Sequence, residues 1–89
     1  MPTDRLTIDP ATLFDNPTDL RVEFVADVGD ERHAFAVPYD TLRAVSGVDP
    51  VTEPVALLQR YAEQIAAAGA KALANDSGRE IVVIGEADL

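Results

Sequence analysis

The stretch LRVEFVADVGDERHAFAV, residues 20–37, restricts the fold more than any other part of the sequence. In its first nine residues, apolar side chains alternate with mainly charged ones, and this period of two is typical of a half-buried strand. Gly29 and Asp30 suit a tight turn, because glycine adopts positive φ without steric cost. The pattern predicts a hairpin of two antiparallel strands, residues 20–28 and 31–37.

The two-residue turn also fixes the register of this hairpin. Counting back from the turn places Phe24 opposite Phe35 on the apolar face. On the other face Asp27 lies opposite Arg32, and an opposite-charge pair of this kind contributes ~0.2–1 kcal/mol. Turn chemistry, apolar face and charge pairing agree, so the hairpin is the best-supported local structure in the chain.

His33, the only histidine, is placed opposite Ala26 on the apolar face by this register. The simplest interpretation is a partly buried side chain at the rim of the sheet, with one ring nitrogen in solvent. A pH-sensitive role is the alternative, because burial and a nearby acid such as Glu31 act on its ionisation in opposite directions. We expect a packing role first.

Helical signals follow the hairpin. Asp40 is predicted as the N-cap and Gly47 as the C-terminal cap of a helix of roughly two turns. A long helix is predicted over residues 53–75, because apolar residues recur every three or four positions and Pro54 suits a first turn. Gly69 lies on its inward stripe, which favours close packing on the sheet over self-association.

The two ends of the chain carry weaker signals. Residues 1–19 hold three of the six prolines and are predicted as an irregular arm, with residues 5–8 as a candidate edge strand. Leu13 and Phe14 are the expected anchors of this arm. The run IVVI, residues 81–84, predicts a short strand that is buried on both faces or nearly so.

Together these elements predict a single α+β domain over residues 20–89, with the order strand, strand, helix, helix, strand. The sheet would be antiparallel, with three strands, or four if the arm contributes one. A short and a long helix would cover one face, and the other would be open and mildly apolar. The candidate interaction or ligand surface consists of Val25, Arg32, His33, Ala34, Ala36 and Tyr39.

Composition excludes several classes of function. The 89 residues have room for one modest core, and the absence of cysteine removes disulfides, thiol nucleophiles and thiolate metal sites. Sixteen acidic residues against seven Lys and Arg give a net charge of −9, which disfavours nucleic acids and membranes as partners. The sequence shows no membrane-spanning run and no secretory signal pattern, so we expect a cytoplasmic protein.

Few residues combine into a pattern that carries chemistry. Ser46 and Ser77 lie beside glycines, which explains them as helix-end and turn residues, and no nucleophile-elbow pattern supports a Ser-His-Asp triad. Asp27, Asp30 and Glu31 gather at the hairpin tip, where loose binding of a hard cation is less favoured than ordinary solvation of a turn. We therefore expect no catalytic residue, no cofactor and no metal ligand.

Several segments resemble the DUF1488 family of small bacterial proteins of unknown function. The similarity covers roughly residues 13–89. It is carried by LFD before the hairpin, RVEFVA in the first strand, VPYDTLRAVSG from the second strand into the short helix, LLQRY in the long helix, and IVVIGEADL at the end. The resemblance implies a compact α+β domain, and it implies no activity, cofactor or catalytic residue.

Two functional hypotheses remain. The first is a small non-catalytic interaction or regulatory accessory domain, which offers the open sheet face or a sheet edge to another protein or to a second copy of itself. The alternative is a small enzyme or ligand-binding domain with its site around His33, Tyr39 and the hairpin tip, residues 27–31. A pocket lined by these residues would favour the second hypothesis, and a flat sheet face would favour the first.

Overall fold

The predicted hairpin forms the centre of the sheet. In the computed structural model, which describes residues 6–75, 78 and 80–89, β3 (Arg21–Val28) and β4 (Glu31–Pro38) pair antiparallel. Phe24 lies opposite Phe35 and Ala26 opposite His33, as the two-residue turn predicts. Gly29 in that turn has a φ of 61°, a backbone conformation that favours glycine. The hairpin prediction is confirmed in its register.

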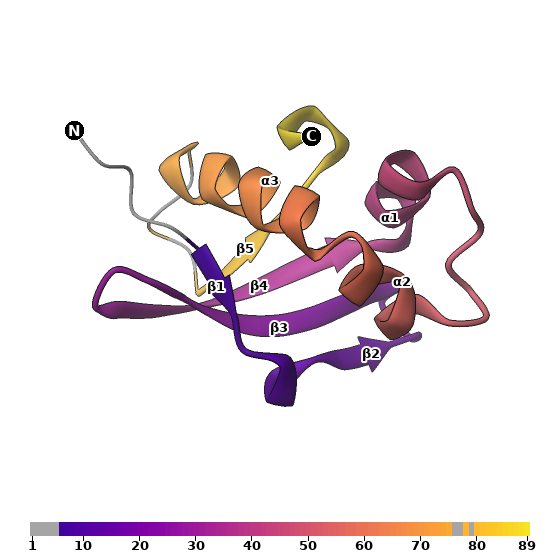
Figure 1. Ribbon diagram of the computed structural model, residues 1–89, viewed down its shortest axis with the longest axis horizontal. Helices are drawn as coiled ribbons and strands as arrows, with labels where there is room; N and C mark the ends of the chain where they lie inside the picture. Colours follow the sequence, from indigo (N-terminus) through magenta and orange to yellow (C-terminus); the bar gives the residue numbers. More distant parts are fainter. Residues whose placement is uncertain (1–5, 76–77, 79) are drawn as a thin grey trace.

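Further strands extend the hairpin on both sides (Figure 1). β1 (Leu6–Ile8) and β2 (Phe14–Asn16) pair antiparallel with the two halves of β3, and the 3-10 turn η1 (Pro10–Thr12) separates them. β5 (Ile81–Val83) pairs with β4, so the strand order is β1-β3-β4-β5, with β2 also beside β3. The α+β class is confirmed.

Two details of the predicted sheet are wrong. β5 runs parallel to β4, so the sheet is mixed rather than antiparallel. The connection between these strands contains helices that carry the chain back along the sheet, and a crossover of this kind delivers the next strand in the parallel direction. β5 is also an edge strand: Val82 is 1% exposed but Val83 is 46% exposed, so the strand is not buried on both faces.

The described part of residues 1–19 is not an irregular arm, because it contributes β1 and β2 to the sheet. Leu13 packs against the core as expected. Phe14 does not anchor the segment, since it is 57% exposed. It lies opposite Glu23, so the pleat directs its side chain to the face without helices. Strands of three residues are too short to show a period of two in the sequence.

Within the described residues, three α-helices cover one face of the sheet (Figure 1): α1 (Tyr39–Ser46), α2 (Pro54–Arg60) and α3 (Ala62–Asn75). Gly47 ends α1 with a φ of 75°, as predicted. The predicted N-cap at Asp40 is wrong, because the helix begins at Tyr39, immediately after the strand, and Pro38 occupies the cap position.

The predicted long helix is divided at Tyr61, whose φ of −108° and ψ of 26° interrupt the helical backbone. Neither proline nor glycine lies at this point, so packing of the surrounding elements accounts for the break. α2 packs against α1 and the β2–β3 end of the sheet, while α3 lies over β1 and β5. The break therefore separates two helices that contact different parts of the sheet.

The core lies between α3 and the covered face of the sheet. Phe24 and Phe35 stack there, with ring centroids 5.3 Å apart. A Cβ atom at Gly69 would lie 3.0 Å from Cδ1 of Leu6 and 3.2 Å from Cδ1 of Ile84. Glycine therefore lets α3 approach the sheet closely, which confirms the packing role predicted for it.

Candidate functional site

The face of the sheet opposite the helices carries most of the residues that the sequence singles out. Val25 pairs with Ala34 across the hairpin, and the pleat directs both side chains away from the core. Ala36, two residues further along β4, points to the same side, but its neighbours bury it completely (0% exposed). We call this side of the sheet the uncovered face.

An apolar strip crosses the uncovered face. In one row of paired residues, apolar side chains cross β3, β4 and β5 at Val25, Ala34 and Ile81. In the neighbouring row, Phe14 of β2, Ala36 of β4 and Val83 of β5 are apolar, and Glu23 of β3 lies between Phe14 and Ala36. Phe14 and Val83, at the two ends of one row, are among the most exposed large hydrophobic residues described. The apolar strip consists of Phe14, Val25, Ala34, Ala36, Ile81 and Val83.

Charged side chains border the apolar strip. Toward the hairpin turn, Arg32 contacts Asp9 at 2.8 Å and Asp27 at 3.4 Å. The hydrogen bond from Arg32 lowers the pKa of Asp9, and the same contact raises the pKa of Arg32. On both sides of the strip, and at Glu23 within the row that joins Phe14 to Val83, four carboxylates accompany two guanidinium groups, so the surroundings of the strip are acidic. The residues of this acidic border are Asp9, Asp19, Arg21, Glu23, Asp27 and Arg32.

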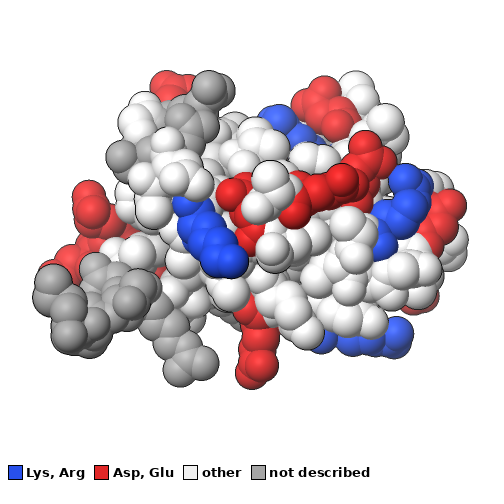
Figure 2. Space-filling model, turned by 90° about the horizontal axis from the view of Figure 1, so that it is seen from above, with Lys and Arg blue, Asp and Glu red and all other residues white. Residues whose placement is uncertain are grey.

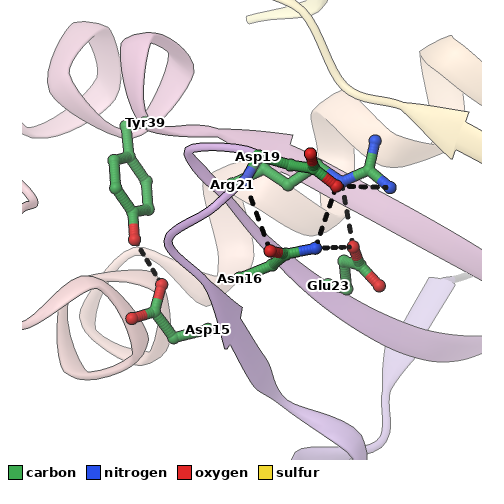
Figure 3. A network of polar contacts seen from close by, with 6 residues as sticks. All are labelled: Asp15, Asn16, Asp19, Arg21, Glu23 and Tyr39. Carbon is green, nitrogen blue, oxygen red and sulfur yellow. Dashed lines mark hydrogen bonds and ion pairs between the residues drawn. The ribbon is translucent and has the colours of Figure 1, made fainter.

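A polar network closes the other end of the strip, where β2 turns into β3 (Figure 3). The Asn16 amide donates to Asp19 at 3.1 Å and to Glu23 at 3.0 Å, and Arg21 donates to Glu23 at 2.9 Å. The hydrogen bonds from Asn16 and then Arg21 lower the pKa of Glu23. The network spans the loop that contains Leu20, whose φ of 55° is unusual outside glycine. Its contacts therefore hold this hairpin loop in place.

Tyr39 joins the helical layer to the sheet beside this network. Its hydroxyl donates a hydrogen bond to Asp15 of β2 (Figure 3). That bond, together with burial, raises the pKa of Tyr39 to about 12. The phenol is therefore a hydrogen-bond donor at neutral pH and not a proton acceptor.

The structure does not bring His33 and Tyr39 together. His33 lies near the start of β4, with its side chain 22% exposed and its ring steeply inclined to that of Phe35, at 6.4 Å between centroids. The Glu31 carboxylate is 4.0 Å from Nε2. Tyr39 follows the other end of β4, and at ~3.3 Å per residue the two positions are ~20 Å apart. One small site cannot include both residues.

A small hollow lies where the loop after α1 meets α2. Its volume is about 190 Å³, below the ~300–1,000 Å³ of typical ligand pockets. The residues that line it are Val48, Asp49, Thr52, Glu53, Ala56, Leu57 and Arg60. None of them is among the sequence-based candidates, because VDPVTEP carries only the signals of a linker and a helix start.

The sequence-based candidates also omit Asp15, Asn16 and Asp19. They lie in residues 1–19, where the prolines indicate an irregular arm. The sequence pattern therefore assigns these polar residues to no helix or strand. The signal that could have found the loop is NPTD itself, since Asn and Asp three residues apart around a proline are typical turn residues. Nothing in the local sequence identifies Tyr39 as the partner of Asp15, which comes from a distant segment.

The helix-covered side carries dispersed charge, with acidic side chains spread over it and separate basic groups between them (Figure 2). Among residues 6–75, 78 and 80–89, no three His, Asp or Glu side chains are grouped so that they could hold a metal ion. Within the same residues, no helix has the length and apolarity needed to cross a bilayer.

Comparison with known proteins identifies a solved structure with a similar fold. No family model matches the chain, and no curated protein is a significant match. The fold is similar to the crystal structure of a protein of unknown function from the DUF1488 family of Shewanella loihica PV-4, with a TM-score of 0.70. The match covers 94% of this chain and 96% of that chain at 9% identity. The DUF1488 resemblance is thus confirmed at the level of the fold.

Proposed function

We propose that this chain is a small non-catalytic interaction domain that binds a basic protein through the uncovered face of its sheet. The apolar strip with its acidic border is the observation that carries the proposal. An apolar centre within a polar rim is the usual anatomy of a protein interface. Phe14 and Val83 supply exposed apolar area at the two ends of the strip.

The charge balance favours a basic partner. Four carboxylates and two guanidinium groups border the strip, and the whole chain carries −9. Complementary charge steers a partner to such a surface and suppresses wrong partners. The expected partner therefore presents an apolar ridge flanked by Lys or Arg side chains.

The enzymatic alternative has less support. His33 and Tyr39 lie at opposite ends of β4, and the phenol of Tyr39 already donates to Asp15. The carboxylates near the strip are engaged in ion pairs or in hydrogen bonds that hold a loop. Tyr39 and these carboxylates therefore have structural roles that account for their positions.

The test compares Ala34→Lys with Ala67→Lys. Ala34 lies at the centre of the strip, whereas Ala67 is exposed on α3, so the two variants add the same side chain and charge to opposite sides. Circular dichroism first verifies that both variants fold. Wild type and both variants are then used as bait in a native lysate, and the captured proteins are identified by mass spectrometry.

We expect wild type and Ala67→Lys to capture the same basic proteins, and Ala34→Lys to lose them. Capture should also weaken as salt is raised, because salt screens the complementary charges. The proposal fails if Ala34→Lys captures the same set as wild type, or if wild type captures nothing that Ala34→Lys lacks.

A further inference from the structure

The two edges of the sheet differ in their protection against pairing with another chain. The β1–β2 edge consists of two pieces of three residues, separated by a 3-10 turn that contains Pro10. Short, interrupted edges with proline resist the addition of a strand. β5 and the residue after it read IVVI, without charge or proline, and no strand of the described chain covers its outer side. β5 therefore lacks the interruption, proline and charge that protect the other edge, and only its length of three residues limits pairing.

The backbone of β5 presents groups that can pair on this open side. The Ile84 N–H donates to the Ala36 carbonyl at 2.9 Å, so residues 82 and 84 direct their polar groups toward β4. Because successive residues of a strand point to opposite sides, the N–H and C=O groups of Ile81 and Val83 are directed outward. The Thr41 hydroxyl donates to the Ile84 carbonyl at 2.8 Å and fixes the end of the strand.

We infer that a second copy of this chain occupies the open edge, with its own β5 antiparallel to the first about a two-fold axis. Pairing centred on Val82 places Ile81 of one copy opposite Val83 of the other. The outward N–H and C=O groups of these two residues can then form hydrogen bonds between the copies. This arrangement is self-complementary, as a two-fold interface must be. The exposed side chain of Val83 gains an apolar neighbour in this arrangement.

Charge selects the antiparallel direction. Glu80, which is exposed, lies immediately before β5. Antiparallel pairing places the two Glu80 carboxylates at opposite ends of the paired strands, whereas parallel pairing would bring them side by side. Like charges directly opposite each other on paired strands are destabilising. The second copy therefore joins in the antiparallel direction.

The dimer is weak because β5 has only three residues. So short a strand makes a small interface, and small interfaces are those of weak, transient complexes, so dimerisation is expected only at high protein concentration. Each copy carries −9, and salt screens the repulsion between them. Dimerisation should therefore strengthen with salt, the opposite of binding to a basic partner. This inference does not rest on the proposed function.

The test is sedimentation equilibrium from ~10 µM to ~1 mM protein, at low and high salt. Val83→Pro removes an N–H that points away from β4, so it blocks the edge and leaves the β4–β5 ladder intact. Val83→Thr is the matched control, because it keeps the N–H and a β-branched side chain. We expect the mass to rise from 9.5 kDa toward twice that value for wild type and Val83→Thr, and to stay at 9.5 kDa for Val83→Pro.

A wild-type chain that remains monomeric over the whole range overturns the inference. A folded Val83→Pro chain that dimerises as wild type does also overturns it. If circular dichroism shows Val83→Pro to be unfolded, Val83→Lys replaces it, because lysine protects an edge without altering the backbone. The expected and contradicting results are then the same as for the proline variant.

Discussion

The two faces of the β3–β4 hairpin differ in the size and packing of their side chains. On the covered face Phe24 and Phe35 stack, and Gly69 brings α3 close to them. On the uncovered face smaller residues such as Val25 and Ala34 lie between ion pairs. The backbone is common to both, so the difference lies only in alternate side chains. We therefore expect most of the folding free energy to arise on the covered face.

The largest effect is expected from a matched pair of substitutions in β3 that tests this contrast, Val22→Ala and Val25→Ala. Val22 is completely buried on the covered face, so its truncation removes buried methyl groups and leaves a cavity, at a cost of ~2–3 kcal/mol. Val25 is half-buried on the uncovered face, and its truncation should cost under ~1 kcal/mol. Urea denaturation measures both. Equal losses of unfolding free energy in the two variants would contradict the difference between the two faces.

A smaller effect is expected where α3 meets the covered face. Gly69→Ala gains ~1 kcal/mol of helix propensity but forces a Cβ to within 3.0 Å of Leu6 and 3.2 Å of Ile84. Overpacking costs ~1–3 kcal/mol, so a net loss of ~1 kcal/mol is expected. Gly85→Ala is the control, since its Cβ would meet only Asp88 at 3.8 Å and its φ of −92° suits alanine.

Thermal or urea unfolding measures the stability of both glycine variants relative to wild type. The Gly85 variant should be as stable as wild type or slightly more stable, because alanine restricts the unfolded chain. If Gly69→Ala were the more stable of the two, the helix would not be close-packed on the sheet, and the covered face would resemble the uncovered one more than we infer.

The hairpin could be predicted in full because its determinants are local. The turn at Gly29 sets every pair along β3 and β4, and a period of two over many residues leaves no other register. The packing role of Gly69 was also predictable, since glycine lowers helix stability and is favoured on an apolar stripe where a neighbouring element must come close. In both cases the signal lies in residues close together in the sequence, even though Gly69 packs against distant residues.

The features that were missed depend on residues far apart. The direction of β5 follows from how the helices return the chain, and the break at Tyr61 follows from contacts with two different parts of the sheet. The bond from Tyr39 to Asp15 joins segments 24 residues apart. Of the predicted surface, the four residues of the uncovered face lie together, while His33 and Tyr39 do not. Those four share a face through the hairpin register alone.

The smallest effect is expected from Glu23→Gln on the uncovered face. Hydrogen bonds from Asn16 and Arg21 lower the pKa of Glu23 from its ordinary value of 4.5. The folded chain therefore binds this proton less readily than the unfolded chain does. Glu23 contributes stability above pH 4.5 that is lost as the pH falls through its lower folded value. Since Glu23 and Arg21 lie near the surface, we expect this contribution to the free energy of unfolding to be under ~1 kcal/mol.

Urea denaturation between ~pH 6 and ~pH 3 measures this contribution. Wild type should lose slightly more stability over that interval than Glu23→Gln. Glu63→Gln, which removes the same charge from an exposed position on α3, should follow wild type. Identical curves for wild type and Glu23→Gln would mean that the network does not hold the charged carboxylate. A difference of several kcal/mol would mean that the uncovered face stabilises the fold as much as the covered face, which would end the contrast between them.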